Sequence, residues 1–596
     1  MAVAAGTLYF LTAARDLVVG DSPDLITAAV ILGVPHPPGY PLFTMLGHLF
    51  SLLPIGSLAF RVNLLSVTCD ALTVGIVFLT AVRLSGSRLA ATVAALILAL
   101  NPLFWSWSLV AEVFSLNNFL ASLVIYFLVV WHERPERMWP LLLASFTTGL
   151  GFSNHHTIAL LGPAIFFSVW RCRATLWKRP LTIPLALAVF LFGLLPYAYI
   201  PWAAARHPAW NWGNVASFSD LLKLVSRQQY GGLRLIGAPY SGGSVWLRIA
   251  TLCFSFGAVT GSLALLGLIR AYRSCRWYFW FSLLAFGFTG LLFAIISDLN
   301  LESATSAAWV LQRFFLLPEV AVAPLVGFGV LLVADVIASS TPIAHGKRLI
   351  PVAGALGVVI LVMLFTKYQQ IDLSHNHIAR NYGEDVLASL EPNSLLFVQG
   401  DPYLFPLAYL TSVEKVRPDV RLIATRLLAG RWYIEQLRAQ YPDLNLPFDA
   451  YDGERNCFKA LIEANRSRPI ALIGPPPDGS AIRDYFPYPH GLVQLIEPNS
   501  KWIPIEAYAQ DNEQLLKRYR MPKPADIRDQ TFEHGILFHY SLAAWQVGTK
   551  FESVGSNTEA QVWYQRAREI DPGSEAIYHA LLTDSAQFQG LYNGGL

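Results

Sequence analysis

The chain has 596 residues, of which 54% are hydrophobic and only 14% are charged. An average soluble domain carries about 25% charged residues, so this composition excludes an ordinary soluble protein and indicates a membrane protein. The net charge of +3 is small and dispersed, and we therefore expect no nucleic-acid partner. The five cysteines have no metal-ligand spacing, and we expect packing roles for them: Cys69, Cys172, Cys253, Cys275 and Cys457.

Two acids follow the apolar N-terminus. Residues 2–14 predict a short or truncated first span, with no signal-peptide cleavage pattern before the acids. Asp21 and Asp24 lie three residues apart, so a helix would place both carboxylates on one face. The alternative is helix capping, with Asp21 at the cap and Asp24 in the first turn.

The acids are followed by a proline-rich corner, His36-Pro-Pro-Gly-Tyr-Pro41. Proline fixes φ, and a residue before proline avoids the helical region, so this stretch predicts a rigid turn. We expect a short acidic helix before it and an amphipathic or re-entrant helix at residues 42–53. Charged, irregular chain among apolar spans is tolerated only where it lines a cavity, which makes this segment the leading candidate for a site.

Runs near the 20 apolar residues that cross a bilayer occupy the chain up to residue 367. We predict about eleven transmembrane helices, at residues 2–14, 60–82, 89–106, 112–131, 139–153, 157–171, 181–201, 246–269, 278–297, 314–337 and 349–367. Alternate loops are basic, and the positive-inside rule places them in the cytoplasm. The opposite loops, at residues 202–245 and 298–313, and all residues after 368 are then extracytoplasmic, in a multi-pass protein of the inner membrane.

The composition changes after residue 368, where charged residues and turns become frequent. Residues 394–398, 420–423 and 468–474 predict buried strands with helices between them, which indicates a small α/β domain. Residues 532–590 predict helices, and the segment 560–572 resembles the second helix of a tetratricopeptide repeat. We therefore expect a transmembrane domain at 1–367, an extracytoplasmic α/β domain at 368–530 and a helical cap at 531–596.

Two outer loops carry candidate binding residues. Trp210, Asn211 and Trp212 combine aromatic faces with an amide, which suits a sugar, although an interfacial aromatic belt is an equal alternative. Arg227 and Arg313 are candidate clamps for a phosphate, or else arginines that extend to the membrane interface. Two polar neighbours of Arg227 complete this candidate substrate-binding set: Gln228 and Tyr230.

Further candidates lie at the predicted outer ends of spans. Glu112 begins a predicted helix, where it either caps the helix or contacts substrate. Asn154 and His155 lie between two half-spans, and His155 is followed by His156; adjacent histidines point to different helix faces, so we expect no metal there. His36 is either a hydrogen-bonding turn residue or a general acid/base.

These motifs together carry a family resemblance. The strings GDSPDLITAA, GVPHPPGYPLF, AEVFSLN, GLGFSNHHT, WNWGN, RQQYGG and QRFF occur in order, and GDPYLFPLAYL follows later. The set resembles a bacterial domain-of-unknown-function family related to the animal transmembrane O-mannosyltransferases that act on plexin-type domains. That resemblance implies the GT-C superfamily, which transfers a sugar from a polyprenyl-phosphate carrier on the outer membrane face.

The resemblance also implies roles for residues. In the superfamily an acid of the first outer loop is the catalytic base, which falls here on Asp21 or Asp24. Family members commonly have Asp-Ser/Cys-Gly/Ala-Glu at this place, and this chain departs from that pattern at Pro23 and Asp24. We therefore expect an inverting transferase that moves a mannose-like sugar to a hydroxyl of a protein or glycan, with no metal cofactor. A multi-pass transporter or flippase of lipid-linked sugars is the alternative, but the chain lacks the visible inverted repeats expected of one.

Overall fold

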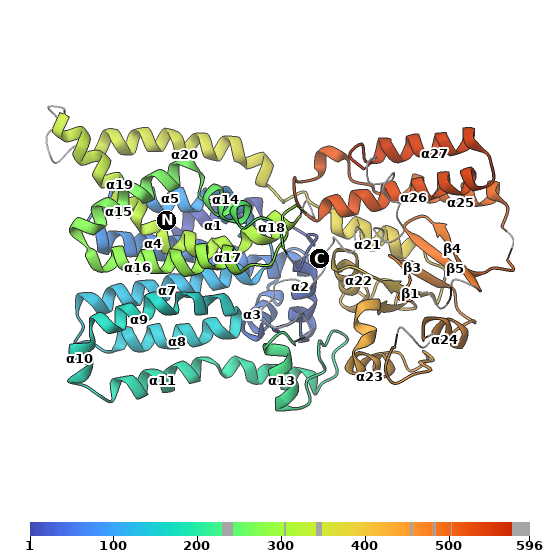
Figure 1. Cartoon of the computed structure of the whole chain (residues 1–596), viewed down its shortest axis with the longest axis horizontal. Coiled ribbons are helices and arrows are strands. Elements are labelled where there is room, and N and C mark those ends of the chain that lie inside the picture. The colour runs from blue at the N-terminus through green and yellow to red at the C-terminus, as the bar shows by residue number, and fades with distance from the viewer. Residues whose placement is uncertain are drawn as a thin grey trace. The chain divides into compact units, whose positions relative to one another are not determined.

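The computed structural model describes residues 1–228, 242–302, 306–340, 349–452, 457–478, 481, 484–501 and 503–574 (Figure 1). The chain forms two compact units, each assembled from separate stretches of sequence. The first, the helical unit, comprises the described residues of Met1–Arg15, Tyr40–Ile200 and Tyr230–His375. The second, the mixed unit, comprises those of Asp16–Gly39, Pro201–Gln229 and Asn376–Leu596. The segment Asp16–Gly39, which contains Asp21, Asp24 and His36 and is called the acidic loop below, therefore belongs to the same unit as the α/β part of the chain.

The helical unit consists of helices that pack side by side. Neighbouring pairs include α4 with α7, α7 with α8, α8 with α11, and α15 with α19 (Figure 1). Its helices are α1 Ala2–Thr12, α3 Pro41–Ser51, α4 Leu58–Ser85, α5 Arg88–Ala99, α6 Pro102–Trp107, α7 Val113–Glu133, α8 Trp139–Asn154, α9 Gly162–Arg171, α10 Arg173–Trp177, α11 Thr182–Gly193, α14 Val245–Ser255, α15 Gly257–Ser274, α16 Arg276–Phe286, α17 Phe293–Ile296, α18 Ala307–Gln312, α19 Leu316–Ser340 and α20 Leu349–Ile371. A further helix, α12 Tyr199–Ala204, follows α11.

Several of these helices can cross a membrane. Among the described residues, six helical segments are long and apolar enough, or seven if one bent pair is a single span. The six are Leu58–Ser85, Val113–Glu133, Thr182–Ala204, Arg276–Ile296, Ala307–Ser339 and Leu349–Ile371. Each of the eleven predicted ranges is largely helical, but α1 and α5 have only 11 and 12 residues. The polytopic helical architecture is confirmed, and the count of eleven spans stays a prediction.

One predicted span differs clearly from the expectation. Residues 246–269 were expected to form one straight helix, yet α14 and α15 meet at an angle of 87°. The break falls at Gly257, whose φ of +66° lies in the left-handed region. Glycine adopts this conformation at little steric cost, so the chain turns there without leaving the apolar sequence pattern.

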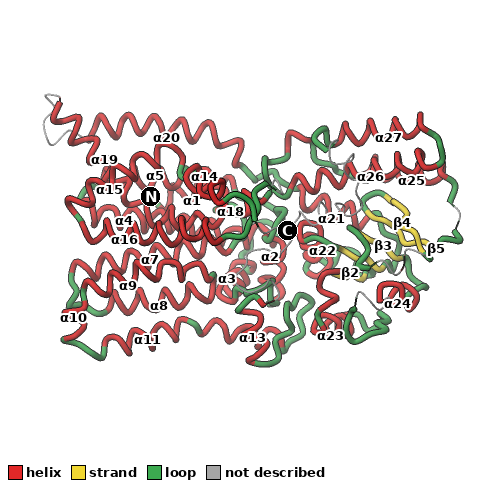
Figure 2. Tube along the Cα trace, viewed as in Figure 1, coloured by secondary structure: helices red, strands yellow, loops and turns green. Residues whose placement is uncertain are grey.

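The C-terminal part of the mixed unit holds a five-stranded sheet in the order β2-β1-β3-β5-β4 (Figure 2). β1 (Leu395–Val398) pairs in parallel with β2 (Arg421–Ala424) and β3 (Ile470–Ile473), which confirms the three predicted strands. An antiparallel hairpin, β4 (Tyr485–His490) and β5 (Val493–Pro498), completes the sheet and was not predicted. Prolines in β4 concealed it; they are tolerated because β4 is an edge strand.

The remaining helices of the mixed unit are α2 Ser22–Ile31, α13 Phe218–Val225, α21 Ile378–Ala388, α22 Asp401–Ser412, α23 Arg431–Gln440, α24 Cys457–Ala464, α25 Ile505–Arg518, α26 Glu533–Ser553 and α27 Asn557–Ile570. α26 and α27 pack together as a helical pair, as the predicted helical tail required (Figure 1). Their likeness to a tetratricopeptide repeat and the domain boundaries at 367 and 530 stay predictions. The part of the predicted tail after residue 574 lies outside the described residues.

Candidate functional site

The acidic loop folds as expected into a short helix, α2, and a corner, and the second expected helix, α3, follows it. Asp21 occupies the N-cap position of α2, but its side chain makes no capping hydrogen bond to the helix. Asp24 lies in the first turn, and its carboxylate binds groups outside the helix. Both acids therefore lie where the capping alternative placed them, but the side-chain capping bond is not formed, and their functional roles stay predictions. The sequence placed them on the right element but did not reveal what the carboxylates contact.

Asp24 is completely buried and accepts three hydrogen bonds. One carboxylate oxygen lies 2.6 Å from His36 Nδ1 and accepts from the His36 backbone N–H at 3.2 Å. The other oxygen accepts from Trp210 Nε1 at 2.5 Å. A buried carboxylate is stable only when it is paired and hydrogen-bonded in this way. Asp24 therefore connects the corner to residues 209–214, the tryptophan loop, by hydrogen bonds. Asp21 is partly exposed at the start of α2.

The tryptophan loop is fixed to the acidic loop by its backbone as well. Val34 forms a bridge with Asn211: the Val34 N–H donates to the Trp210 carbonyl at 3.0 Å, and the Trp212 N–H donates to the Val34 carbonyl at 3.1 Å. The close approach requires glycine at position 33, since a Cβ there would lie 2.2 Å from the Trp210 carbonyl oxygen. Trp210 and Trp212 are only 7% and 5% exposed, so both are packing residues of this unit as well as candidate sugar contacts.

This packing predicts a large effect of a small substitution. In Gly33→Ala the new methyl group overlaps the Trp210 carbonyl, so the bridge must shift, at a cost of about 1–3 kcal/mol. We expect a lower unfolding temperature in detergent. Gly162→Ala is the matched control, because a Cβ there meets nothing within 4 Å. Equal unfolding temperatures for both variants would contradict the proposed close contact.

Two aromatic side chains from the C-terminal part of the mixed unit contact the corner and the tryptophan loop. The Phe405 ring of α22 lies 6.4 Å from the His36 ring, nearly parallel to it, and 6.2 Å from the Trp210 ring. The Trp432 ring lies 6.2 Å from Trp212. We name the set Asp21, Asp24, His36, Trp210 and Phe405, with the adjacent Asp401, the acid cluster.

Asp401 is the ionisable member of the acid cluster that the sequence did not single out. It is the first residue of α22, directly after Gly400 in the family-like string GDPYLFPLAYL. The only sequence signal was that string, because nothing in it indicates that α22 packs against α2. Desolvation raises the pKa of Asp401 to about 6; the Asp21 and Asp24 carboxylates act in the same direction, and Arg426 and His36 oppose them.

His36 is also perturbed by its surroundings. Burial alone would lower the pKa of His36, but the Asp24 carboxylate, with contributions from Asp21 and Asp401, raises it above its ordinary value. The imidazole is therefore held in its charged form to a higher pH than a free histidine. It can serve as the hydrogen-bonding turn residue and as a proton carrier, so both interpretations of His36 from the sequence remain open.

The raised pKa of His36 predicts a pH-dependent stability. A group whose pKa is higher in the folded state stabilises that state fully below its unfolded pKa of about 6.5 and loses this contribution as the pH rises through the folded value. Wild type should therefore unfold at a higher temperature than His36→Gln at pH 6, and the difference should shrink steadily above that pH. Thermal unfolding of both proteins in detergent between pH 6 and 9 measures this. A difference independent of pH would contradict the His36–Asp24 pairing.

Three buried polar atoms next to the acid cluster have no hydrogen-bond partner within the described residues. They are Ser22 Oγ, Asn211 Oδ1 and Trp212 Nε1, which belong to residues that are 2%, 2% and 5% exposed. Buried polar groups are normally satisfied, so such orphans need an explanation. A hydroxyl and an indole N–H can donate, and an amide oxygen can accept, which is the complement that a polyhydroxylated ligand requires.

A second group of predicted residues gathers in the helical unit. Arg313 Nη1 lies 3.9 Å from Glu112 Oε1, and the guanidinium lies 5.4 Å from the centre of the Phe114 ring. Glu112 occupies the N-cap position of α7, as the capping interpretation placed it, although its side chain makes no capping hydrogen bond. The two side chains are 3% and 14% exposed, for Glu112 and Arg313 respectively. We name this group the arginine cluster.

The predicted Asn154 and His155 extend the arginine cluster. His155 packs 4.9 Å from Phe114 and stacks on Tyr40 with ring centres 6.0 Å apart. Asn154 donates from Nδ2 to the Val113 carbonyl at 2.9 Å, while its Oδ1 is buried with no partner among the described residues. His156 instead approaches the Tyr197 hydroxyl, with Nε2 at 2.9 Å. The adjacent histidines therefore have different partners, as their spacing predicted.

For the remaining predicted binding residues, the structure gives only the backbone position and the burial of the side chain. Arg227 follows α13 with a φ of +56° and is half-buried, and Gln228 after it is exposed. Tyr230 lies outside the described residues. Within the described part of the chain, no three or more His, Cys, Asp or Glu side chains form a group that could hold a metal ion. Metal independence stays a prediction.

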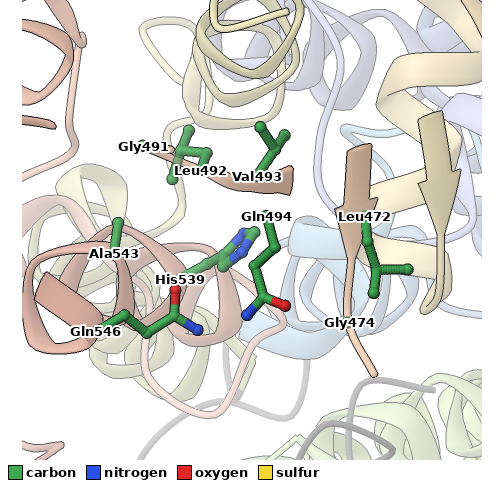
Figure 3. A pocket seen from close by; sticks show the side chains of 9 residues that line it. All are labelled: Leu472, Gly474, Gly491, Leu492, Val493, Gln494, His539, Ala543 and Gln546. Carbon is green, nitrogen blue, oxygen red and sulfur yellow. The ribbon is translucent and has the colours of Figure 1, made fainter. Parts of the chain in front are cut away.

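Two hollows differ sharply in chemistry. In the helical unit, an open groove of about 420 Å³ is lined by Pro163, Phe166, Phe167, Trp170, Leu284 and Phe288, and it suits an apolar chain. In the mixed unit, a small hollow is lined partly by Gln494, His539 and Gln546 (Figure 3). Burial lowers the pKa of His539 to about 3, and its Nδ1 lies 2.8 Å from the Tyr382 hydroxyl. Because the small hollow has no charged lining residue, the acid cluster is the stronger candidate for chemistry.

Comparison with known families gives a consistent answer. Residues 21–178 match the family described as "Protein O-mannosyl-transferase TMEM260 N-terminal domain", and residues 379–454 match "TMEM260-associated domain 2". Protein O-mannosyl-transferase TMEM260 of Mus musculus is 31% identical over 464 residues, 75% of this chain. Its relative in Dictyostelium discoideum is 27% identical over 542 residues, 82% of this chain. In both cases the match covers 65% of the relative's length.

A solved structure supports the fold. ArnT from Cupriavidus metallidurans bound to undecaprenyl phosphate aligns with a TM-score of 0.52 at 13% identity, over 83% of this chain and 97% of that one. At this identity the likeness shows the fold alone, which is that of the GT-C glycosyltransferases. The predicted resemblance to the O-mannosyltransferase family is confirmed, while membership of the GT-C superfamily and a place in a bacterial branch stay predictions.

Proposed function

We propose that this chain, which carries two domains of the TMEM260 protein O-mannosyl-transferases, is a membrane glycosyltransferase with a polyprenyl-phosphate sugar as donor. The sugar is mannose-like, and the acceptor is a hydroxyl, in the first place Ser or Thr of a protein. The reaction takes place on the extracytoplasmic face of the inner membrane, which the basic loops on the other side support. About eleven spans complete the transmembrane part.

The arrangement of the acid cluster carries this proposal. Asp24 has its carboxylate occupied by His36 and Trp210, whereas Asp21 is partly exposed beside it. A general base must reach the proton that it removes, and a fully bonded, buried carboxylate is poorly suited to this task. We therefore assign the base to Asp21 and an anchoring role to Asp24.

The reaction then balances as follows. The acceptor oxygen attacks the anomeric carbon, the bond from that carbon to the phosphate oxygen breaks, and the hydroxyl proton passes to the Asp21 carboxylate. Attack from the side opposite the phosphate inverts the anomeric configuration. Polyprenyl phosphate leaves as an anion, so the leaving group needs cationic stabilisation rather than a proton.

The helical unit supplies features that fit the donor. The Arg313 guanidinium lies 3.9 Å from the Glu112 carboxylate, and its positive charge suits the donor phosphate. Arg227 is a second candidate for the phosphate. The apolar groove suits the polyprenyl tail. Glu112, Asn154 and His155 offer hydrogen bonds to the sugar, and Trp210, Asn211, Trp212, Gln228 and Tyr230 form the proposed substrate-binding set of the outer loop.

Donor turnover tests this proposal against transport. Purified protein is offered a panel of polyprenyl-phosphate sugars, with membrane extract as the source of acceptor, and release of free polyprenyl phosphate is followed. A transferase releases the carrier from one donor class only when acceptor is present. A transporter or flippase leaves the sugar–phosphate bond intact with every donor, and that result would overturn the proposal.

A further inference from the structure

The C-terminal domain approaches the acidic loop through one helix. α22 packs against α2, and both belong to the mixed unit. Phe405 contacts His36 and Trp210 by its ring. Asp401 precedes Phe405 by four residues, and residues four apart lie on the same face of a helix. The side chain of Asp401 is therefore carried on the face of α22 that packs against the acid cluster.

Four charged side chains act on Asp401, and they come from α2, from the corner after it and from the turn after β2. Asp21 is at the N-cap of α2, and Asp24 is in its first turn. His36 lies in the corner, and Arg426 follows β2. The tryptophan loop, residues 209–214, adds no ionisable side chain. Among these, Asp21 contributes the largest electrostatic influence on Asp401 after desolvation. An interaction between two titrating groups acts on both of them.

We propose that Asp401 is a positioning residue of the Asp21 centre: α22 packs against α2 and brings a second carboxylate to the acid cluster, where its negative charge favours transfer of the acceptor hydroxyl proton to Asp21. This inference rests on the proposed function and extends it, because a residue of the C-terminal domain then influences proton transfer to Asp21. A carboxylate beside another carboxylate holds a shared proton more tightly, and a base is most effective near the operating pH. Arg426 and His36 limit the repulsion, so the pair tolerates two negative charges.

Within the described residues, three unsatisfied buried polar atoms in the same part of the chain support a binding site near this centre. Ser22 follows Asp21 directly, and its buried hydroxyl has no partner among the described residues. Asn211 Oδ1 and Trp212 Nε1, on either side of the bridge to Val34, are buried without partners in the same part of the chain. A simple helix-starting role for Asp401 accounts for none of these atoms.

The pH dependence of transfer tests the role of Asp401. In Asp401→Asn the neighbouring negative charge is removed, so Asp21 loses proton affinity. The acidic limb of the pH–rate profile should then move to lower pH by roughly one unit, and kcat at neutral pH should fall about 3- to 30-fold. The KM for the donor should stay unchanged. Asp401→Glu should restore the wild-type limb, and the exposed Asp449→Asn is the matched control.

A second measurement does not depend on activity. Asp401 is one of the charges that raise the pKa of His36, so Asp401→Asn should lower the midpoint of the His36 titration. Nuclear magnetic resonance of ¹³C-labelled histidine, with His36→Gln to assign the signal, measures that midpoint. An unmoved midpoint, or an unmoved acidic limb in an otherwise active Asp401→Asn protein, would overturn this inference alone. Absence of transfer by wild type would overturn the proposed function, and this inference with it.

Discussion

Asp21→Asn should abolish sugar transfer while leaving the protein folded in the membrane. The substitution removes the proposed base but conserves size, and general-base catalysis contributes about 10²- to 10⁴-fold to a rate. Because Asp21 is partly exposed and the substitution conserves its size, we expect little change in unfolding temperature. The measurement is the turnover rate of the donor, with unfolding temperature determined on the same preparation.

Comparison with Asp24 sharpens this prediction. Asp24→Asn removes the charge that binds His36 and Trp210, so it should lower both the unfolding temperature and the turnover rate. The surface variant Asp220→Asn, which loses the charge that pairs with Lys223 and accepts from the Ser217 hydroxyl at the start of α13, is the control for both acids. Full turnover by Asp21→Asn would remove Asp21 as the base. A stable Asp24→Asn that has lost all turnover would transfer the role to Asp24.

Arg313→Gln should weaken donor binding strongly. A hydrogen bond between two charged groups contributes about 1.5–3 kcal/mol, which corresponds to a loss of roughly 10- to 150-fold in affinity for the phosphate-bearing donor. Arg313→Lys should recover part of this loss, because it keeps the charge but not the planar, two-pronged geometry. Equilibrium binding of a polyprenyl-phosphate sugar to detergent-purified protein measures the effect.

The control for Arg313 is Arg431→Gln, which removes an arginine whose side chain is 77% exposed and pairs only within its own helix. If Arg313→Gln binds the donor as tightly as wild type, the arginine cluster does not hold the phosphate. Arg227 would then be the next candidate. A general loss of binding in both arginine variants would instead indicate damage to the fold.

Local patterns predicted most of the elements. Apolar runs located the helices of the spans, and prolines located the corner between α2 and α3. The strands β1 to β3 followed from short buried runs between turns. The bend at Gly257 was not predicted, because a single glycine in an apolar run is also tolerated inside a continuous helix. The strand β4 escaped because proline argues against a strand unless its position at the sheet edge is known.

The chemistry of the acid cluster could be predicted only in part. Asp24 was singled out from the sequence, and its role stays a prediction; its partner Trp210 is 186 residues away, and hydrogen bonds of that separation leave no periodic signal. Asp401 joins the cluster only because α22 packs against α2. The pairing of Glu112 with Arg313 was hidden for the same reason, although each residue was recognised separately. Tertiary packing therefore decided which polar residues act together.

The most direct test of the central claim is detection of the sugar on the acceptor. Purified wild type is incubated with polyprenyl-phosphate mannose and a Ser/Thr-rich acceptor protein, and mass spectrometry locates any added hexose. The account predicts hexose on a Ser or Thr oxygen with wild type and none with Asp21→Asn. Hexose added equally by both proteins would contradict Asp21 as the base. Absence of hexose on every acceptor, with the donor bound but intact, would contradict glycosyl transfer itself.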